Sequence, residues 1–281
     1  MSTGTLYIVA TPLGNLEDVT LRALRILREV PLIACEDTRR TVKLLNRYEI
    51  RTPMTPFHDH NKLQAGAALM RRLKDGQSVA LVSDAGTPGV SDPGYELVRD
   101  AVAAGVPVEA VPGPSALICA LVVSGLPTDR FAFEGFLPNR PGARRKALST
   151  LSGEARTMIF YESPQRIAAF LADACRAFGG RRGCVVRELT KVHEEVLRGT
   201  LPELSAEISG RESVPGEITV VVAGAPKRAA VSVEDAVAEA LADASEGASS
   251  RDLAREVSGR TGLSKKEVYE EILRRRRGEE S

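Results

Sequence analysis

Two adjacent carboxylates, Glu36 and Asp37, directly follow a short apolar run of the chain. A carboxylate at the end of a strand can take a proton from a substrate or accept a hydrogen bond from a hydroxyl group. Arg39 and Arg40 stand close behind them in the sequence, so the two acids could instead form a solvated, charge-balanced turn. The residue types alone leave both interpretations open.

Other reactive side chains give weaker signals. Residues 58–61 (HDHN) are polar, but no further ligands at metal-binding spacing accompany them, so we expect a hydrogen-bonding loop and no metal ion. Cys35 and Ser83 lack a recognisable base with an orienting partner, which argues against covalent catalysis. The four cysteines include no CxxC pair, as is usual for single thiols in a reducing cytoplasm.

Three loops rich in glycine and proline, at residues 11–15, 83–94 and 112–115, follow expected strands. In open α/β sheets, ligands bind beyond the carboxyl ends of the strands, and glycine lets the backbone approach a ligand closely. Any one of these loops could be an ordinary turn, but together they favour a small-molecule site. None contains GxGxxG or GxxxxGK[ST], so dinucleotide and nucleoside triphosphate binding are poorly supported.

Strands and helices alternate along the first part of the chain, which predicts an α/β domain with a largely parallel sheet. A second β-rich unit follows, with a basic loop at 139–146, and three short helices come last, two of them with helix-turn-helix proportions around 259–262. The expected parts are 1–115, 116–228 and 229–281. The expected strands are 5–10, 31–35, 78–82, 108–111, 130–136, 157–161, 184–187 and 217–223, and the expected helices follow Asn15 or span 62–74, 95–104, 115–124, 163–178, 235–244, 250–258 and 264–275.

Composition restricts the partners of this chain. Its 38 Lys and Arg against 37 Asp and Glu leave a net charge of +1, so any nucleic acid must be met by a local basic patch. Aromatic residues make up 4% and include no Trp, which argues against a base-stacking platform. Basic clusters at 39–51, 140–146 and 251–277 nevertheless favour an RNA or DNA substrate.

One stretch, residues 110–128, carries no charge over a length close to that of a bilayer span. Prolines and glycines interrupt it at both ends, so we expect a short buried helix there and not a membrane segment. The N-terminus has no basic region before an apolar core, and a cytoplasmic protein is the expectation.

The ordered motifs of this chain closely resemble those of one family, the small-subunit ribosomal RNA methyltransferase I proteins of the tetrapyrrole-methylase fold superfamily. The resemblance covers roughly residues 5–225, with a family-like helical tail after it. The motifs are VATPLGNLEDVTLRAL (9–24), ACEDTRRT (34–41), HDHN (58–61), VSDAGTPGVSDPG (82–94), VPGPSAL (111–117), EGFLP (134–138), FYESPQRI (160–167) and RELTKVHEEVLRGTL (187–201).

The resemblance implies two α/β domains of the tetrapyrrole-methylase type with S-adenosylmethionine (SAM) in the cleft between them, a small C-terminal helix-turn-helix-like segment, and a homodimer. The implied reaction is methyl transfer to the ribose 2′-hydroxyl of cytidine 1402 of 16S ribosomal RNA in the small subunit. Because the sulfonium of SAM already activates the methyl group, the chemistry needs no metal.

The resemblance also implies roles for particular residues. Glu36 or Asp37 would accept the hydroxyl proton, with His58 in reserve. The sequence has Ala-Gly-Thr where the superfamily has a Gly-Asp-Pro turn, and Glu162 where the porphyrin enzymes have Met. The implied SAM contacts are Leu13, Ala85, Gly86, Thr87, Val90, Ser115, Ala116, Tyr161, Glu162 and Leu189, and the basic residues expected to meet RNA are Arg39, Arg40, Arg140, Arg144, Arg145 and Lys146.

Two alternatives remain open at this point. The chain could be a C-methyltransferase of a tetrapyrrole precursor, although such an enzyme would not need the basic segments or the tail. It could also be a SAM-sensing RNA-binding protein without turnover.

Overall fold

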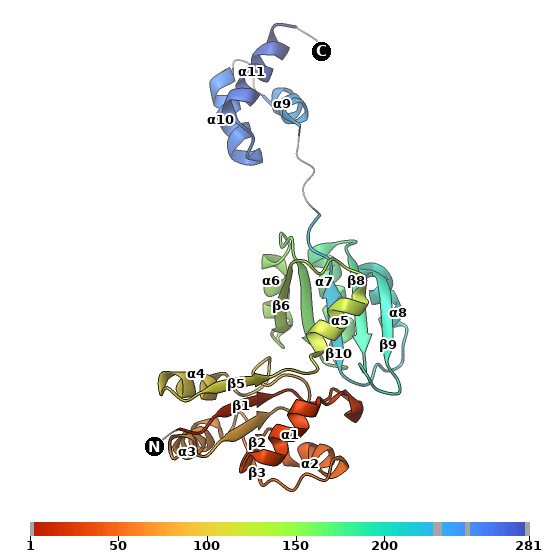
Figure 1. The fold of residues 1–281 in the computed structure, drawn as a ribbon. Coiled ribbons are helices and arrows are strands. Elements are labelled where there is room, and N and C mark those ends of the chain that lie inside the picture. The colour runs from red at the N-terminus through yellow and green to blue at the C-terminus, as the bar shows by residue number, and fades with distance from the viewer. Residues whose placement is uncertain (1–2, 227–231, 245–247, 279–281) are drawn as a thin grey trace. The chain divides into compact units, whose positions relative to one another are not determined.

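The computed structural model describes residues 3–226, 232–244 and 248–278. The chain forms two compact units, Met1–Ala225 and Pro226–Ser281. The first unit contains two five-stranded sheets, one in each half of its sequence (Figure 1). The division that we expect at 115/116 falls between these halves and stays a prediction.

The sheet of the first half is parallel throughout, in the order β3-β2-β4-β1-β5. Helices α1 and α2 pack on one face and α3 and α4 on the other, so its strands are apolar on both sides. The strands are β1 (Leu6–Val9), β2 (Leu32–Cys35), β3 (Met54–Pro56), β4 (Val79–Val82) and β5 (Val108–Val111). The helices are the 3₁₀ turn η1 (Leu16–Asp18), α1 (Leu21–Glu29), α2 (Thr38–Arg47), α3 (Lys62–Lys74) and α4 (Tyr95–Ala103).

The sheet of the second half has the order β6-β7-β10-β8-β9 and is mixed: β6 and β7 are parallel, and the other pairings are antiparallel. Side chains alternate along β10, so Val221 packs under α5 while Val220 and Val222 face α6, α7 and α8 (Figure 1). The strands are β6 (Phe131–Phe136), β7 (Thr157–Glu162), β8 (Arg182–Arg187), β9 (Glu195–Thr200) and β10 (Ile218–Val222). The helices are α5 (Ala116–Ser124), α6 (Pro141–Thr150), α7 (Ile167–Phe178) and α8 (Leu201–Ser209).

Several expected elements differ from those observed. The helix expected directly after Asn15 begins later, because Asn15 caps only the short η1 and Thr20 caps α1. The expected basic loop 139–146 is mostly helix α6, which starts at Pro141, a residue favoured in the first helical turn. Helices α2 and α8 and strands β3 and β9 were not expected.

The second unit is formed by α9 (Val233–Ala242), α10 (Ser250–Thr261) and α11 (Lys265–Arg276), which share an apolar core of their own. The expected turn at 259–262 is shorter than the sequence suggested. Gly259 lies inside α10, and Gly262 ends that helix with a left-handed backbone. Over the described segments of the chain, no helix has the length and apolar character needed to cross a bilayer.

Candidate active site

Hydrogen bonds join the three glycine- and proline-rich loops into one surface at the carboxyl edge of the first sheet. The backbones of Thr11 and Gly86 exchange two hydrogen bonds, at 2.8 and 2.9 Å. The Thr87 hydroxyl donates to the carbonyl of Pro114 at 3.2 Å. Loops that are far apart in the sequence therefore form a single wall, as the sequence predicted for a ligand site.

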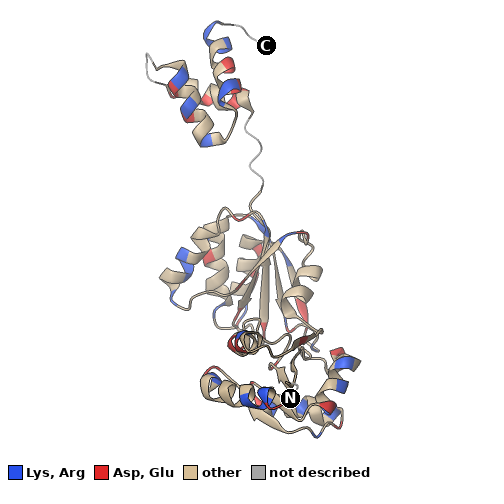
Figure 2. Ribbon diagram, turned by 60° about the vertical axis from the view of Figure 1, so that its left-hand side comes forward, with Lys and Arg blue, Asp and Glu red and all other residues tan. Residues whose placement is uncertain are grey.

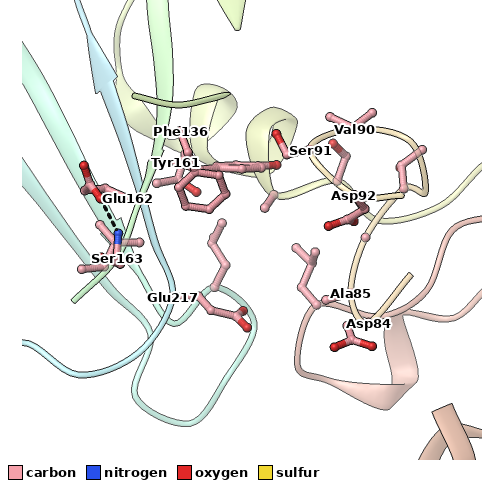
Figure 3. A pocket seen from close by; sticks show the side chains of 18 of the residues that line it. Asp84, Ala85, Val90, Ser91, Asp92, Phe136, Tyr161, Glu162, Ser163 and Glu217 are labelled. Atoms are coloured by element: carbon pink, nitrogen blue, oxygen red, sulfur yellow. Dashed lines mark hydrogen bonds between the residues drawn. The ribbon is translucent and has the colours of Figure 1, made fainter. Parts of the chain in front are cut away.

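This wall faces the second sheet across a cavity of about 370 Å³, a size that suits a small organic ligand. Figure 3 shows Asp84 and Asp92 on one side of it and Tyr161 and Glu217 on the other. All ten residues expected to contact SAM line this cavity, and so does Glu36. The remaining lining residues are Arg40, Asp84, Ser91, Asp92, Phe136, Ser163, Pro164, Gly216, Glu217, Ile218 and Thr219.

Backbone shape limits one part of the cavity wall. Gly86 has φ +80°, a left-handed backbone conformation that residues other than glycine rarely adopt. A Cβ atom at this position would lie 3.3 Å from Cδ2 of Leu13. The loop therefore needs glycine to let Leu13 and the backbone of residue 86 line the same surface.

Carboxylates gather in the cavity from both sheets. Asp84 accepts a hydrogen bond from the backbone of Asp37 at 2.9 Å and lies 3.4 Å from the guanidinium of Arg40. Arg40 also lies 3.9 Å from Glu217, which in turn pairs with Lys191 at 3.2 Å. Asp84 and Glu217 therefore each have a cationic neighbour in the structure.

Two other acids of the cavity have pKa values raised above their usual range. Burial, and next the charge of Glu36, raises the pKa of Asp92 to about 7. Burial, and next the charge of Asp84, also raises the pKa of Glu36. Over the described part of the chain no ion pair is found for Asp92. A carboxylate titrating near neutral pH can act as a general base in water.

The sequence did not single out Asp92 or Glu217 for a role in the reaction. Asp92 belongs to the motif 82–94, so the carboxylate in this long loop was a usable signal. Glu217 carries no comparable signal, because it reaches the cavity only through the pairing of β10 with its neighbours.

Two of the expected catalytic residues, Asp37 and His58, have surroundings less suited to that role than Glu36 has. Asp37 caps helix α2, and hydrogen bonds from Arg39 lower its pKa to about 2, so it is a poor proton acceptor. His58 is not among the lining residues of the cavity. Its backbone amide donates to the side chain of Asn61 at 2.8 Å, which confirms the hydrogen-bonding loop expected at 58–61.

The expected RNA-binding residues divide into three groups. Arg39, Arg140, Arg145 and Lys146 are exposed, and Arg40 lines the cavity. Arg144 is a correction: its guanidinium is buried and lies 2.7 Å from the carboxylate of Asp173. In helix α6 the side chain of Arg144 points towards the core, whereas Arg145 and Lys146 are exposed. Arg144 is therefore not available to RNA.

The lining of the cavity fits SAM. Leu13, Ala116 and Leu189 offer apolar surface for an adenosine group, and the carboxylates suit the sulfonium and ammonium cations. The buried Oε2 atom of Glu162 has no hydrogen-bond partner in the described residues. A hydroxyl or an ammonium group of a ligand could satisfy it.

Comparison with known proteins agrees with this geometry. The family model of the Tetrapyrrole (Corrin/Porphyrin) Methylases matches residues 5–205. Among solved structures, the methyltransferase CobJ aligns with a TM-score of 0.61 at 20% identity, covering 80% of this chain and 96% of that one. Uroporphyrin-III C-methyl transferase from Thermus thermophilus, complexed with S-adenyl homocysteine, aligns with a TM-score of 0.56 at 24% identity, covering 79% and 98%. These likenesses show the fold, two α/β halves of the tetrapyrrole-methylase type.

Curated relatives found by sequence are much more similar to this chain than these solved structures are. Ribosomal RNA small subunit methyltransferase I of Xylella fastidiosa (strain Temecula1) is 52% identical over 84% of this chain and 87% of the relative. The protein of that name from Micromonospora olivasterospora is 46% identical over 96% of this chain and 86% of the relative. The chain therefore belongs to the ribosomal RNA small subunit methyltransferase I family of the tetrapyrrole methylases. This confirms the resemblance drawn from the motifs.

Proposed function

We propose that this chain transfers the methyl group of SAM to the ribose 2′-hydroxyl of cytidine 1402 in the 16S RNA of the small ribosomal subunit. The observation that carries the proposal is the cavity between the two sheets, which is lined by every residue expected to bind SAM and by Glu36. The family relatives, which are named as small-subunit rRNA methyltransferases, support the same activity.

Bound SAM would supply a methyl group made electrophilic by the positive sulfur. The residues that would hold it come from both halves of the first unit. Neither half alone would therefore supply the full set of cofactor contacts. Leu13, Gly86 and Ala116 would contact it from the first wall, and Tyr161 and Leu189 from the second. The chain's own task is to align the hydroxyl oxygen with the methyl group and to take up the proton.

For the proton acceptor we propose Glu36 together with Asp92. A ribose hydroxyl is a very weak acid, so a carboxylate with a raised pKa is a better acceptor than one with an ordinary pKa. Asp84 and Glu217 lie beside the guanidinium of Arg40, which occupies them as ion-pair partners. The charge of Glu36 contributes to the raised pKa of Asp92, which makes Asp92 the better acceptor while Glu36 is ionised.

The RNA backbone would contact exposed basic side chains of the first unit. Arg140, Arg145 and Lys146 follow strand β6, while Arg40 lies within the cavity itself. Lys and Arg are interspersed with acidic residues along the ribbon (Figure 2), in keeping with a net charge of +1. Contacts to phosphates therefore depend on these local groups and should weaken steeply with added salt. We further propose that the protein acts in the cytoplasm as a homodimer.

Transfer of a labelled methyl group tests the proposal. Purified protein and tritiated SAM are incubated with small subunits from a strain deleted for this gene, and the label is mapped by nuclease digestion. We expect label on one ribose 2′-oxygen, at cytidine 1402. Absence of label with SAM still bound would overturn the proposal and favour a tetrapyrrole substrate or a protein that only binds.

A further inference from the structure

Strand β6 carries a β-bulge where it borders the cavity. Its register with β7 shifts between Phe133, opposite Ile159, and Gly135, opposite Phe160, so Glu134 is an extra residue in the strand. Gly135 takes φ +60°, a conformation open to glycine. Bulges redirect the side chains that follow them and are frequent beside active sites.

The bulge brings two aromatic rings to one face of the sheet. Phe133 and Phe136 would face opposite sides of a regular strand, because successive side chains alternate. After the bulge Phe136 lies opposite Tyr161, two residues beyond Ile159 on the same face of β7. Both phenylalanine rings therefore meet Tyr161 edge to face. The ring centroid of Tyr161 lies 4.9 Å from that of Phe133 and 5.6 Å from that of Phe136.

Phe136 is the outermost ring of this group. Phe133 and Tyr161 pack against the core beneath α5, and Tyr161 also borders the cavity. Phe136 lines the cavity as well and keeps 56% of its surface exposed (Figure 3). The low aromatic content of the sequence argued against a base-stacking platform. The structure nevertheless gathers three of its few aromatic rings at one site, so a planar group in the cavity mouth would find a rigid ring to stack on.

Exposed basic side chains follow this ring along the chain and suit a polyanion. The chain passes from Phe136 through the exposed Arg140 into α6, whose outer surface carries Arg145 and Lys146. Arg40 is the cationic side chain inside the cavity. A ligand that presents phosphates to these cations and a planar base to Phe136 is a nucleotide of an RNA chain.

We propose that the base of the target nucleotide stacks on Phe136 while its ribose faces Glu36 and Asp92. This inference rests on the function proposed above. A nucleotide inside folded RNA must leave its stack before its ribose can enter a cavity, and an aromatic ring replaces part of the lost stacking. Stacking is tolerant of base identity, so Phe136 positions the nucleotide and does not select cytidine.

Three single variants test this role. Phe136→Leu removes the aromatic face but keeps apolar bulk, and Phe136→Tyr restores the ring. Phe131→Leu is the matched control, since Phe131 lies on the same strand, is also partly exposed and does not line the cavity. For each variant we would measure kcat and KM for deletion-strain small subunits and, separately, the Kd for SAM by calorimetry.

We expect Phe136→Leu to lower kcat/KM for small subunits by about tenfold or more, since stacking contributes on this scale. Its Kd for SAM should stay within about twofold of the wild type, and Phe136→Tyr and Phe131→Leu should keep most activity. A parallel loss of SAM affinity would overturn the inference, because the ring would then contact the cofactor adenine. Unchanged activity in Phe136→Leu, or an equal loss in Phe131→Leu, would also overturn it. A wild-type chain without methyl transfer would overturn the proposed function as well.

Discussion

Arg144 and Asp173 form an ion pair inside the second half of the first unit, with 2.7 Å between Nη2 and Oδ2. Their side chains are 5% and 4% exposed. Asp173 also accepts from Arg176 at 2.9 Å, so the buried carboxylate has two guanidinium partners. The pair joins α6 to α7, and it converts a residue expected to bind RNA into one that holds these helices together.

Removing one member of this pair should destabilise the protein. We expect Arg144→Ala to lower the free energy of unfolding by about 3–5 kcal/mol, because Asp173 would lose its buried partner. The neighbouring Arg145→Ala should change stability by less than about 0.5 kcal/mol and weaken RNA binding instead. Urea unfolding and salt-dependent filter binding measure the two effects. If Arg144→Ala folded with wild-type stability, the pair would have no structural role.

The proposed acceptor predicts a pH profile. A general base works only when deprotonated, so kcat/KM for SAM should rise with pH through about 7, the pKa of Asp92 in the free protein, and level off above it. Asp92→Asn should remove this rise and lower the rate by about 100-fold. Glu36→Gln should lower the rate similarly. Full activity in both variants at saturating substrate would exclude these carboxylates as acceptors.

The raised pKa of Asp92 also predicts how the stability of the fold depends on pH. This pKa in the folded protein is above the usual 3.8, so the fold favours the protonated form of Asp92. The stability that this protonation contributes is present at low pH and is lost as pH rises towards 7. Asp92→Asn should therefore be more stable than the wild type at pH 8, and this advantage should shrink at pH 5. Denaturant titrations at the two pH values measure it, and a variant less stable at pH 8 would contradict the raised pKa.

Gly86 and Gly105 offer a matched test of the cofactor wall. Both have a left-handed backbone, with φ +80° and +68°, so alanine at either position should cost about 1–2 kcal/mol of stability. Only at Gly86 would the new Cβ press on Leu13. We expect Gly86→Ala to raise the Kd for SAM at least fivefold and Gly105→Ala to leave it unchanged, as measured by calorimetry. Equal affinities would show that SAM does not use this wall.

The second unit should be separable from cofactor binding. Its apolar core consists of its own residues, and every residue that lines the cavity belongs to the first unit. Deleting 226–281 should therefore leave the Kd for SAM nearly unchanged. Affinity for small subunits should fall, because exposed basic residues such as Arg251, Lys265 and Lys266 are lost. An equal loss of SAM affinity would mean that the tail belongs to the catalytic core.

The sequence by itself determined the local features of this protein. Short strands ending in glycine and proline predicted the three loops and their common site, because those residues have restricted backbone preferences that are visible locally. Helix α3 and strand β5 were predicted with the bounds observed. Long ordered motifs were enough to identify the family and the residues expected around SAM.

Tertiary structure decided which way the side chains point. Arg144 and Arg145 are adjacent and chemically alike, yet packing of α6 on α7 buries one and exposes the other. One extra residue in β6 decides that Phe136 faces the cavity, which depends on the register of a neighbouring strand. Asp92 acquires its raised pKa only when folding removes it from water and brings Glu36 close. Burial, register and charge proximity arise between segments distant in the chain, so no local pattern could contain them.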